Sequence, residues 1–325
     1  MRKLPRKTVF FVLTCLLFGL AGGRYVWTRR GFPFVSRREQ WTIGIYRSNS
    51  PFQFNQLQGW INPLFRAEDV KDVHAKFVAD PFLIKEGKTW NLFFEVYNND
   101  TKQGDLAVAT SRNTWVWNYE KVIVDEPFHL SYPYVFKGDD GYYLIPESYQ
   151  ANSIRLYKAD EFPTKWSFVK TLVEGRDYVD NSIVYYNGKW WLFSSVTSND
   201  KLYLHYADTL TGPWKEHPLS PIVSGNVHKS RPSGRLLIYN GKLYRFTMDV
   251  DPPVGTHRVM AYEITEITPD SYSEQLAQEA PVLVASGSGW NGQAMHQLDP
   301  VQMDENSWIS SVDGFGKYWI FGWQY

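Results

Sequence analysis

Residues 179–196 read VDNSIVYYNGKWWLFSSV. Two runs rich in β-branched and aromatic residues, which favour strands, lie on either side of Asn187-Gly188. An Asn-Gly pair between such runs is the strongest short signal for a β-hairpin, because a type I′ turn needs positive φ at both central residues. The stretch therefore predicts two antiparallel strands joined by a tight turn.

The same order of strand, turn and strand recurs along the chain. The other copies are ADPFLIKEGKTWNLFFEV (79–96), SYPYVFKGDDGYYLIPES (131–148), SRPSGRLLIYNGKLYRFTMD (230–249) and MHQLDPVQMDENSWISSVDG (295–314). The first four copies are spaced by 52, 48 and 51 residues, and the fifth follows after 65. A period of about 50 residues indicates a repeated structural unit.

A second pattern fills the spaces between these hairpins. RLYKADEFPTKW (155–166) closely matches YLHYADTLTGPW (203–214), whereas LAVATSRNTWVW (106–117) and RVMAYEITEITPDSY (258–272) are looser copies. Each reads as a third strand, a loop and a short fourth strand. Four strands per repeat are typical of a propeller blade, so the pattern predicts an all-β, five-bladed β-propeller. Two β-sandwiches are the alternative, but they explain the period less well.

The last repeat has too little chain after it for a full blade. The strand-like segment QWTIGIYRS (40–48) lies upstream without a partner of its own, and KYWIFGWQY (317–325) ends the chain. Pairing these two segments would complete the fifth blade and leave no open sheet edge. We therefore expect residues 31–325 to form one circularly closed propeller.

The N-terminus has the layout of an export signal. Residues 1–7 are basic, and residues 8–23 form an uncharged apolar run. Sixteen residues make a helix of roughly 24 Å, slightly short of a ~30 Å hydrocarbon core. We expect residues 1–30 to be a transmembrane signal anchor and its flanks, with the propeller outside the cytoplasm. A cleaved signal and a buried core helix remain as alternatives.

The composition limits the classes of partner and cofactor. Lysine plus arginine equals aspartate plus glutamate, 34 against 34, so no net charge favours a nucleic acid or another polyanion. Aromatic residues make up 17% of the chain, and we assign most of them to packing between blades. The single cysteine, Cys15, lies in the N-terminal apolar run. No disulfide, thiolate metal site or other cofactor is therefore predicted for the propeller.

The inner strands of a propeller begin near its axis, so the residues at their starts converge. These residues are Asp80, Tyr132, Asp180, Arg231 and His296. Glu147 and Asp249 lie at the ends of the second strands. Glycoside hydrolases cleave glycosidic bonds with a pair of carboxyl groups, one acting as acid and the other as base or nucleophile. Their different environments separate the pKa values of the two groups. The pattern indicates a carbohydrate site at the axis.

The blade pattern resembles the five-bladed furanosidase superfamily, which includes glycoside hydrolase family 43 and the fructan hydrolases. The resemblance implies that Asp80, in ADPF, acts as base or nucleophile and that Asp180, in VDNS, tunes the acid. The general acid of that superfamily is a glutamate at the start of the fourth inner strand, where this chain has Ser230-Arg231-Pro232. Glu147 is the candidate substitute.

A closer resemblance covers about residues 40–325. The phrases FVADPFL, IPES, VDNSIVYYNGKWWLFSS, RPSGRL and MHQLD are similar to those of a propeller family. This propeller forms the N-terminal part of plant glucosamine inositolphosphorylceramide transferase and also occurs on its own in bacteria. The C-terminal glycosyltransferase domain of the plant proteins is absent from this sequence, so the resemblance does not carry that activity over by name.

Four basic residues precede or begin the fourth inner strand, namely His228, Lys229, Arg231 and Arg235. They form either a clamp for a phosphate or carboxylate, which would favour a sugar-phosphate or glycolipid substrate, or a solvated linker. We expect an enzyme that cleaves or transfers a glycosidic bond, with Asp80, Asp180 and Glu147 catalytic. His296, Arg231, Arg235, Tyr132 and His228 would bind substrate. The alternative is a non-catalytic glycan-binding or scaffold propeller.

Overall fold

The computed structural model describes residues 6–29, 35–54, 62–249 and 258–321. It divides into two compact units, one made of Met1–Glu39 and Lys317–Tyr325 and the other of Gln40–Gly316. The smaller unit contains helix α1 (Arg6–Arg29), and the larger unit contains most of the strands.

Helix α1 includes the apolar run that predicted a membrane anchor. Among the described residues, no helix is both long enough and apolar enough to cross a membrane. The apolar run has only 16 residues between the basic residues at its two ends. The prediction of a helix here is confirmed, and the prediction that it spans a membrane finds no support.

Five sheets follow one another along the described chain, as the repeat predicted. The first contains β2 (Ala75–Glu86), β3 (Thr89–Asn98), β4 (Gln103–Ser111) and β5 (Asn118–Val124). The second contains β6 (Ser131–Gly138), β7 (Gly141–Glu147), β8 (Ser153–Glu161) and β9 (Lys165–Glu174). The third contains β10 (Tyr178–Tyr186), β11 (Lys189–Val196), β12 (Lys201–Ala207), β13 (Lys215–Glu216) and β14 (Val223–Ser224).

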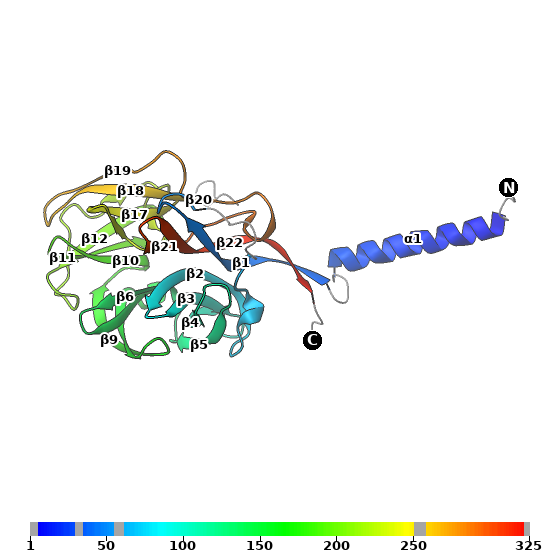
Figure 1. The fold of residues 1–325 in the computed structure, drawn as a ribbon, viewed down its shortest axis with the longest axis horizontal. Helices are drawn as coiled ribbons and strands as arrows, with labels where there is room; N and C mark the ends of the chain where they lie inside the picture. The colour runs from blue at the N-terminus through cyan, green and yellow to red at the C-terminus, as the bar shows by residue number, and fades with distance from the viewer. Residues whose placement is uncertain (1–5, 30–34, 55–61, 250–257, 322–325) are drawn as a thin grey trace. The chain divides into compact units, whose positions relative to one another are not determined.

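The third sheet has one extra short strand, and the last two sheets also depart from the four-strand pattern. The fourth contains β15 (Arg231–Pro232), β16 (Leu237–Tyr239), β17 (Lys242–Asp249), β18 (Arg258–Ile267), β19 (Tyr272–Leu276) and β20 (Leu283–Val284). The fifth contains β1 (Val35–Ser48), β22 (Ser307–Phe321) and β21 (Leu298–Asp304), in the order β1-β22-β21. Figure 1 shows these sheets arranged as the blades of a propeller. The pairing of β1 with β22 confirms the circular closure. The predicted partners differ, because Thr42 contacts Gly314 and Trp41 contacts Phe315, so the segment 40–48 meets the part of β22 before residue 317. Residues 322–325 of the predicted closing strand lie outside the described residues. The fifth blade has three strands, one of which is the long strand β22.

The turn that decided the fold has the expected conformation. Tyr186 pairs with Lys189 across the β10–β11 hairpin. The two residues between them, Asn187 and Gly188, have φ values of 49° and 79°. Positive φ at both positions is the requirement of a type I′ turn, so the local prediction is confirmed.

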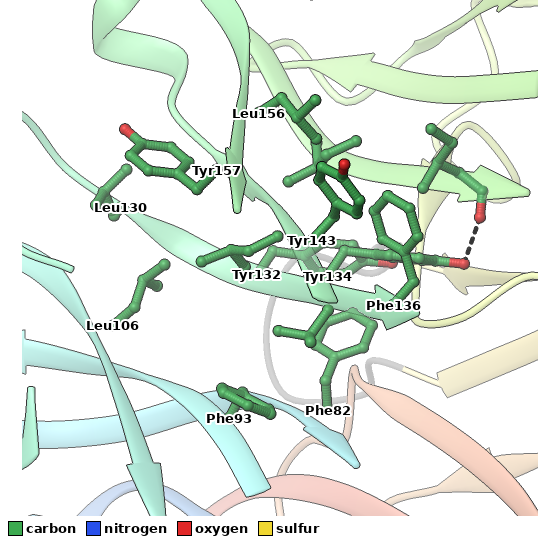
Figure 2. Close-up of a cluster of buried hydrophobic side chains, with 14 of the residues drawn as sticks. Phe82, Phe93, Leu106, Leu130, Tyr132, Tyr134, Phe136, Tyr143, Leu156 and Tyr157 are labelled. Carbon is green, nitrogen blue, oxygen red and sulfur yellow. Dashed lines mark hydrogen bonds between the residues drawn. The ribbon is translucent and has the colours of Figure 1, made fainter. Parts of the chain in front are cut away.

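Aromatic side chains fill the space between blades, as the composition indicated. Phe82 and Phe93 of the first blade pack in one buried cluster with Tyr132 and Tyr134 of the second (Figure 2). The Tyr134 hydroxyl donates a hydrogen bond of 2.6 Å to the carbonyl of Ile183, in the third blade. Removal of this apolar area from water stabilises the ring of blades, and the tyrosine hydroxyls fix their spacing.

The inner strand of the fourth blade is interrupted where it reaches the axis. Gly234 lies in the gap between β15 and β16 with a φ of 117° and forms a bridge to Leu298 of the fifth blade. A Cβ atom at Gly234 would lie 1.7 Å from the Leu298 carbonyl oxygen. The gap brings the backbone of blade four against that of blade five, and only glycine permits this approach.

We therefore expect Gly234→Ala to lower the free energy of unfolding by about 3 kcal/mol, since it combines overpacking with a strained φ. Urea denaturation of the purified chain measures this change. The matched control is Gly188→Ala, because Gly188 also has positive φ but has open space around its Cβ position. The control should cost roughly 1 kcal/mol. Equal losses in the two variants would contradict the close-approach argument.

Candidate functional site

Three inner strands contain a residue with the same unusual backbone conformation. Asp80 in β2, Tyr132 in β6 and Asp180 in β10 have φ values of 52°, 46° and 50°. Each lies in a bulge, where the pairing register with the following strand shifts. The left-handed conformation costs a non-glycine residue roughly 1–2 kcal/mol, so surrounding contacts must hold it.

Hydrogen bonds between blades supply those contacts. The Asp80 backbone N–H donates to Asp313 Oδ2 at 3.1 Å, and the Asp180 N–H donates to Glu147 Oε2 at 3.2 Å. The Tyr132 N–H donates to Asp80 Oδ2 at 3.2 Å. The bulges thus turn backbone donors toward the carboxyl groups of the preceding blade, which gathers several acids at the axis.

His296 bridges two of these acids. Its Nδ1 lies 2.8 Å from Asp313 Oδ1, its Nε2 lies 3.2 Å from Asp80 Oδ1, and its ring packs on Trp41 at 4.1 Å. Burial alone would lower the pKa of His296, but the charges and hydrogen bonds of Asp313 and Asp80 outweigh it and raise the pKa to about 10. The imidazolium therefore joins the fifth blade to the first.

The same three residues have the spacing of a metal site. One ligand atom from each of Asp80, His296 and Asp313 lies within 4.8 Å of the others. Both imidazole nitrogens of His296 face these carboxylates directly.

Arg231 performs the corresponding role on the other side of the axis. Its Nε donates to Asp180 Oδ2, its Nη1 donates to Asn199 Oδ1 at 3.0 Å, and its Nη2 lies 3.7 Å from Glu147 Oε2. Burial and the neighbouring Asp180 raise the pKa of Glu147, and Arg231 opposes this rise. The Arg231 side chain is 24% exposed.

The basic residues around the fourth inner strand are each matched to a separate carboxylate. His228 lies 2.9 Å from Asp249, Lys229 lies 3.2 Å from Glu274, and Arg235 lies 2.8 Å from Asp299. Arg235 also donates to the Val135 carbonyl and faces the rings of Phe82 and Tyr134. The structure therefore distributes these charges among internal ion pairs and does not gather them into one clamp.

Tyr132 lies inside the ring of blades. Its hydroxyl is 2.9 Å from the Ser182 hydroxyl, donates to the Gly234 carbonyl at 3.0 Å and accepts the Gly234 N–H at 2.6 Å. The residue is 1% exposed. Its side chain thus links the second, third and fourth blades.

Comparison with known proteins identifies the family. Residues 36–315 match the family described as glucosamine inositolphosphorylceramide transferase 1, N-terminal. The chain belongs to this family. Glucosamine inositolphosphorylceramide transferase 1 of Oryza sativa subsp. indica is 33% identical over 94% of this chain, and the Arabidopsis thaliana protein of that name is 32% identical over 84%. These alignments cover 45% and 39% of the relatives, so the chain spans less than half of their length.

Solved structures support the fold of the family. The catalytic domain of the Coprinopsis cinerea GH62 α-L-arabinofuranosidase aligns with 85% of this chain and 97% of its own, at a TM-score of 0.55 and 12% identity. The RS223 β-xylosidase aligns with 65% of this chain and 77% of its own, at 0.52 and 14%. At such low identities the likeness concerns the fold alone.

Three residues of the axial cluster were not singled out from the sequence. Glu95 lies in the second strand of blade one, Asp313 lies in the corresponding strand of blade five, and His129 precedes blade two. Alignment of LFFEV, LIPES and SSVDG would have placed Glu95 and Asp313 beside Glu147, because the three phrases occupy the same position in the repeat. No repeat signal marks His129.

The raised pKa of His296 predicts how stability depends on pH. Because the pKa of His296 is higher in the folded state than in the unfolded state, protonation of His296 stabilises the fold. This stabilisation is fully present below about pH 6.5 and is lost as the pH rises through about 10. The difference in free energy of unfolding between the wild type and His296→Gln should therefore shrink as the pH rises across this range. Urea denaturation at about pH 6, 8 and 10 measures it. A constant difference would contradict the imidazolium bridge.

Proposed function

We propose that the axial cluster binds a glycosyl group of a glycan or glycolipid and cleaves or transfers its glycosidic bond. Membership of the family supports a role in carbohydrate chemistry. The observation that carries the proposal is the position of Asp80. Its carboxylate lies at the axis, oriented by the Tyr132 N–H and by His296 Nε2, and 10% of its side chain remains exposed.

The geometry suits Asp80 as base or nucleophile. Two donors hold its oxygens in place, so a sugar carbon or an acceptor hydroxyl would meet a fixed carboxylate. Asp180 is the tuning residue, because its negative charge raises the pKa of the neighbouring Glu147. A proton donor must be a carboxyl that keeps its proton, and burial raises the pKa of both Glu147, which the sequence pattern selects, and Glu95.

A glycan-binding propeller without catalysis is the second candidate. The observation that favours it is Arg231, which lies at the start of the fourth inner strand, where the hydrolases have their general acid. Arg231 forms ion pairs with Asp180 and Glu147. An arginine binds sugar hydroxyls or a charged sugar but donates no proton, because its guanidinium stays charged. In this case the same carboxylates would only accept hydrogen bonds from hydroxyl groups.

We also propose that the N-terminal segment brings the propeller to a membrane surface outside the cytoplasm. The order of basic and then apolar residues in 1–23 supports this proposal. Fractionation of cells that express the full chain tests it. The chain should sediment with membranes, and the variant Leu16→Arg with Leu17→Arg should release it. A wild-type chain found only in the cytoplasmic fraction would contradict the proposal.

Removal of the Asp80 charge distinguishes an enzyme from a binding module. Asp80→Asn should lower the rate of glycoside cleavage or transfer by about 10²–10⁴-fold, since base catalysis contributes that much. A screen of furanosides, pyranosides and phospho-linked sugars provides the assay. The control is Asp140→Asn, in the exposed turn between β6 and β7. Equal activity of wild type and Asp80→Asn would contradict the assignment, and glycan binding without turnover would favour the second candidate.

A further inference from the structure

Glu95 and Glu147 occupy equivalent positions in neighbouring blades. Glu95 pairs with Ala79 across the β2–β3 hairpin, and Glu147 pairs with Ser131 across the β6–β7 hairpin. In both blades the partner immediately precedes the residue with positive φ. The two carboxyl groups therefore start from equivalent backbone positions. Any difference in their contacts comes from the residues around them.

Their backbone partners differ. Glu147 accepts the N–H of Asp180, the positive-φ residue of the next blade. The corresponding donor for Glu95 would be the Tyr132 N–H, but this group donates to Asp80 instead. Within the described part of the chain, no backbone amide donates to Glu95. Asp80 has thus taken the hydrogen bond that would have stabilised the charged form of Glu95.

His129, the basic residue nearest to Glu95, is held in its neutral form. His129 Nε2 lies 3.8 Å from Glu95 Oε1. On the opposite side of the ring, Nδ1 accepts the Gly104 N–H at 2.9 Å, so Nδ1 carries no proton and the neutral ring carries its proton on Nε2. Burial also lowers the pKa of His129. Glu95 consequently faces a neutral imidazole where Glu147 faces a guanidinium.

Gly104 makes this arrangement possible. A Cβ atom at this position would lie 2.2 Å from the Leu130 carbonyl oxygen, 2.8 Å from the His129 ring and 2.9 Å from Glu95 Oε1. The Gly104 carbonyl also accepts the Leu130 N–H at 2.9 Å. The segment before β6 is therefore held by both polar groups of Gly104, which fixes the His129 ring beside Glu95.

The charges around Glu95 favour its neutral form. Burial contributes most to raising the pKa of Glu95 well above its usual value, and the negative charges of Asp80, Glu147 and Asp313 raise it further. The positive charge of His296 opposes them. The side chain still keeps 7% of its surface exposed, so it is not sealed from the axial space.

We propose that Glu95 is the proton donor of the axial site and that His129 is the residue that positions it. This inference rests on the proposed function. As the bond from the anomeric carbon to the leaving oxygen breaks, Glu95 gives that oxygen its proton. The acceptor, water or an alcohol, forms the new bond to carbon and passes its proton to Asp80. Return of that proton from Asp80 to Glu95 restores the site. Glu147 instead balances the charge of Arg231.

Infrared spectroscopy of the full chain tests the protonation state without any substrate. At neutral pH the wild type should show a carbonyl band of a protonated carboxyl group that Glu95→Gln removes. Glu147→Gln is the matched control, and it should keep the band. A band that persists in Glu95→Gln, or that disappears only in Glu147→Gln, would overturn the assignment of Glu95.

Kinetics on a glycoside that the wild type turns over test proton donation. Glu95→Gln should lower the rate by about 10²–10⁴-fold, and the loss should shrink for an aryl glycoside whose leaving group needs no proton. His129→Gln should admit water and move the basic limb of the pH–rate profile to lower pH. An equal loss for both leaving groups would overturn the proposal. If the wild type is inactive on every glycoside, the proposed function is overturned. The infrared measurement needs no substrate, so it tests the protonation of Glu95 separately.

Discussion

The contact on which the rest of the site depends is the His296 bridge between Asp80 and Asp313. These carboxylates belong to the first and fifth blades, which are distant in sequence and meet where the ring closes. An imidazolium between them supplies a positive charge at a point where two acids would otherwise repel each other. The Asp80 N–H donates to the same Asp313, so one side chain orients both the backbone and, through His296, the carboxylate of Asp80. The contacts that close the ring of blades therefore also orient Asp80, the candidate base.

The axial cluster contains more buried acids than cations. His296 and Arg231 each contact two acidic side chains with a single positive charge, and Arg235 is paired with Asp299. Glu95 is the acid without a cation of this kind, since its neighbour His129 is fixed as a hydrogen-bond acceptor at Nδ1. A buried carboxyl that is not offset by a cation lowers its cost by keeping its proton. In our proposal this unequal pairing makes Glu95 the acid that keeps its proton, and glycosyl chemistry requires such a division between an acid and a base.

The fold could be predicted from the sequence because its signals are local and repeated. Turn residues such as Asn187-Gly188 specify each hairpin, and the period of about 50 residues specifies the blade. The starts of the inner strands were also predictable, since repeat alignment places Asp80, Asp180, Arg231 and His296 together. The pairing of charges was not, because it depends on which partner each side chain meets across a blade boundary. Arg235 and His228 belong to one basic run in the sequence, yet the fold assigns them to Asp299 and Asp249. His129 lies in a linker, where no repeat indicates that it would reach Glu95.

The central claim is that a sugar binds where the inner strands begin. A second cavity is the alternative sugar-binding site. It has a volume of about 440 Å³, lies at the other ends of inner strands and is lined by residues that include Ile84, Ile238 and Trp308. The most direct measurement is an experimental structure of the full chain with a glycoside that it binds in a glycan array. The account predicts a sugar ring within hydrogen-bond distance of Asp80 and Arg231, with its glycosidic oxygen toward Glu95. A sugar bound in the cavity beside Trp308, with the axial carboxyl groups unoccupied, would contradict it.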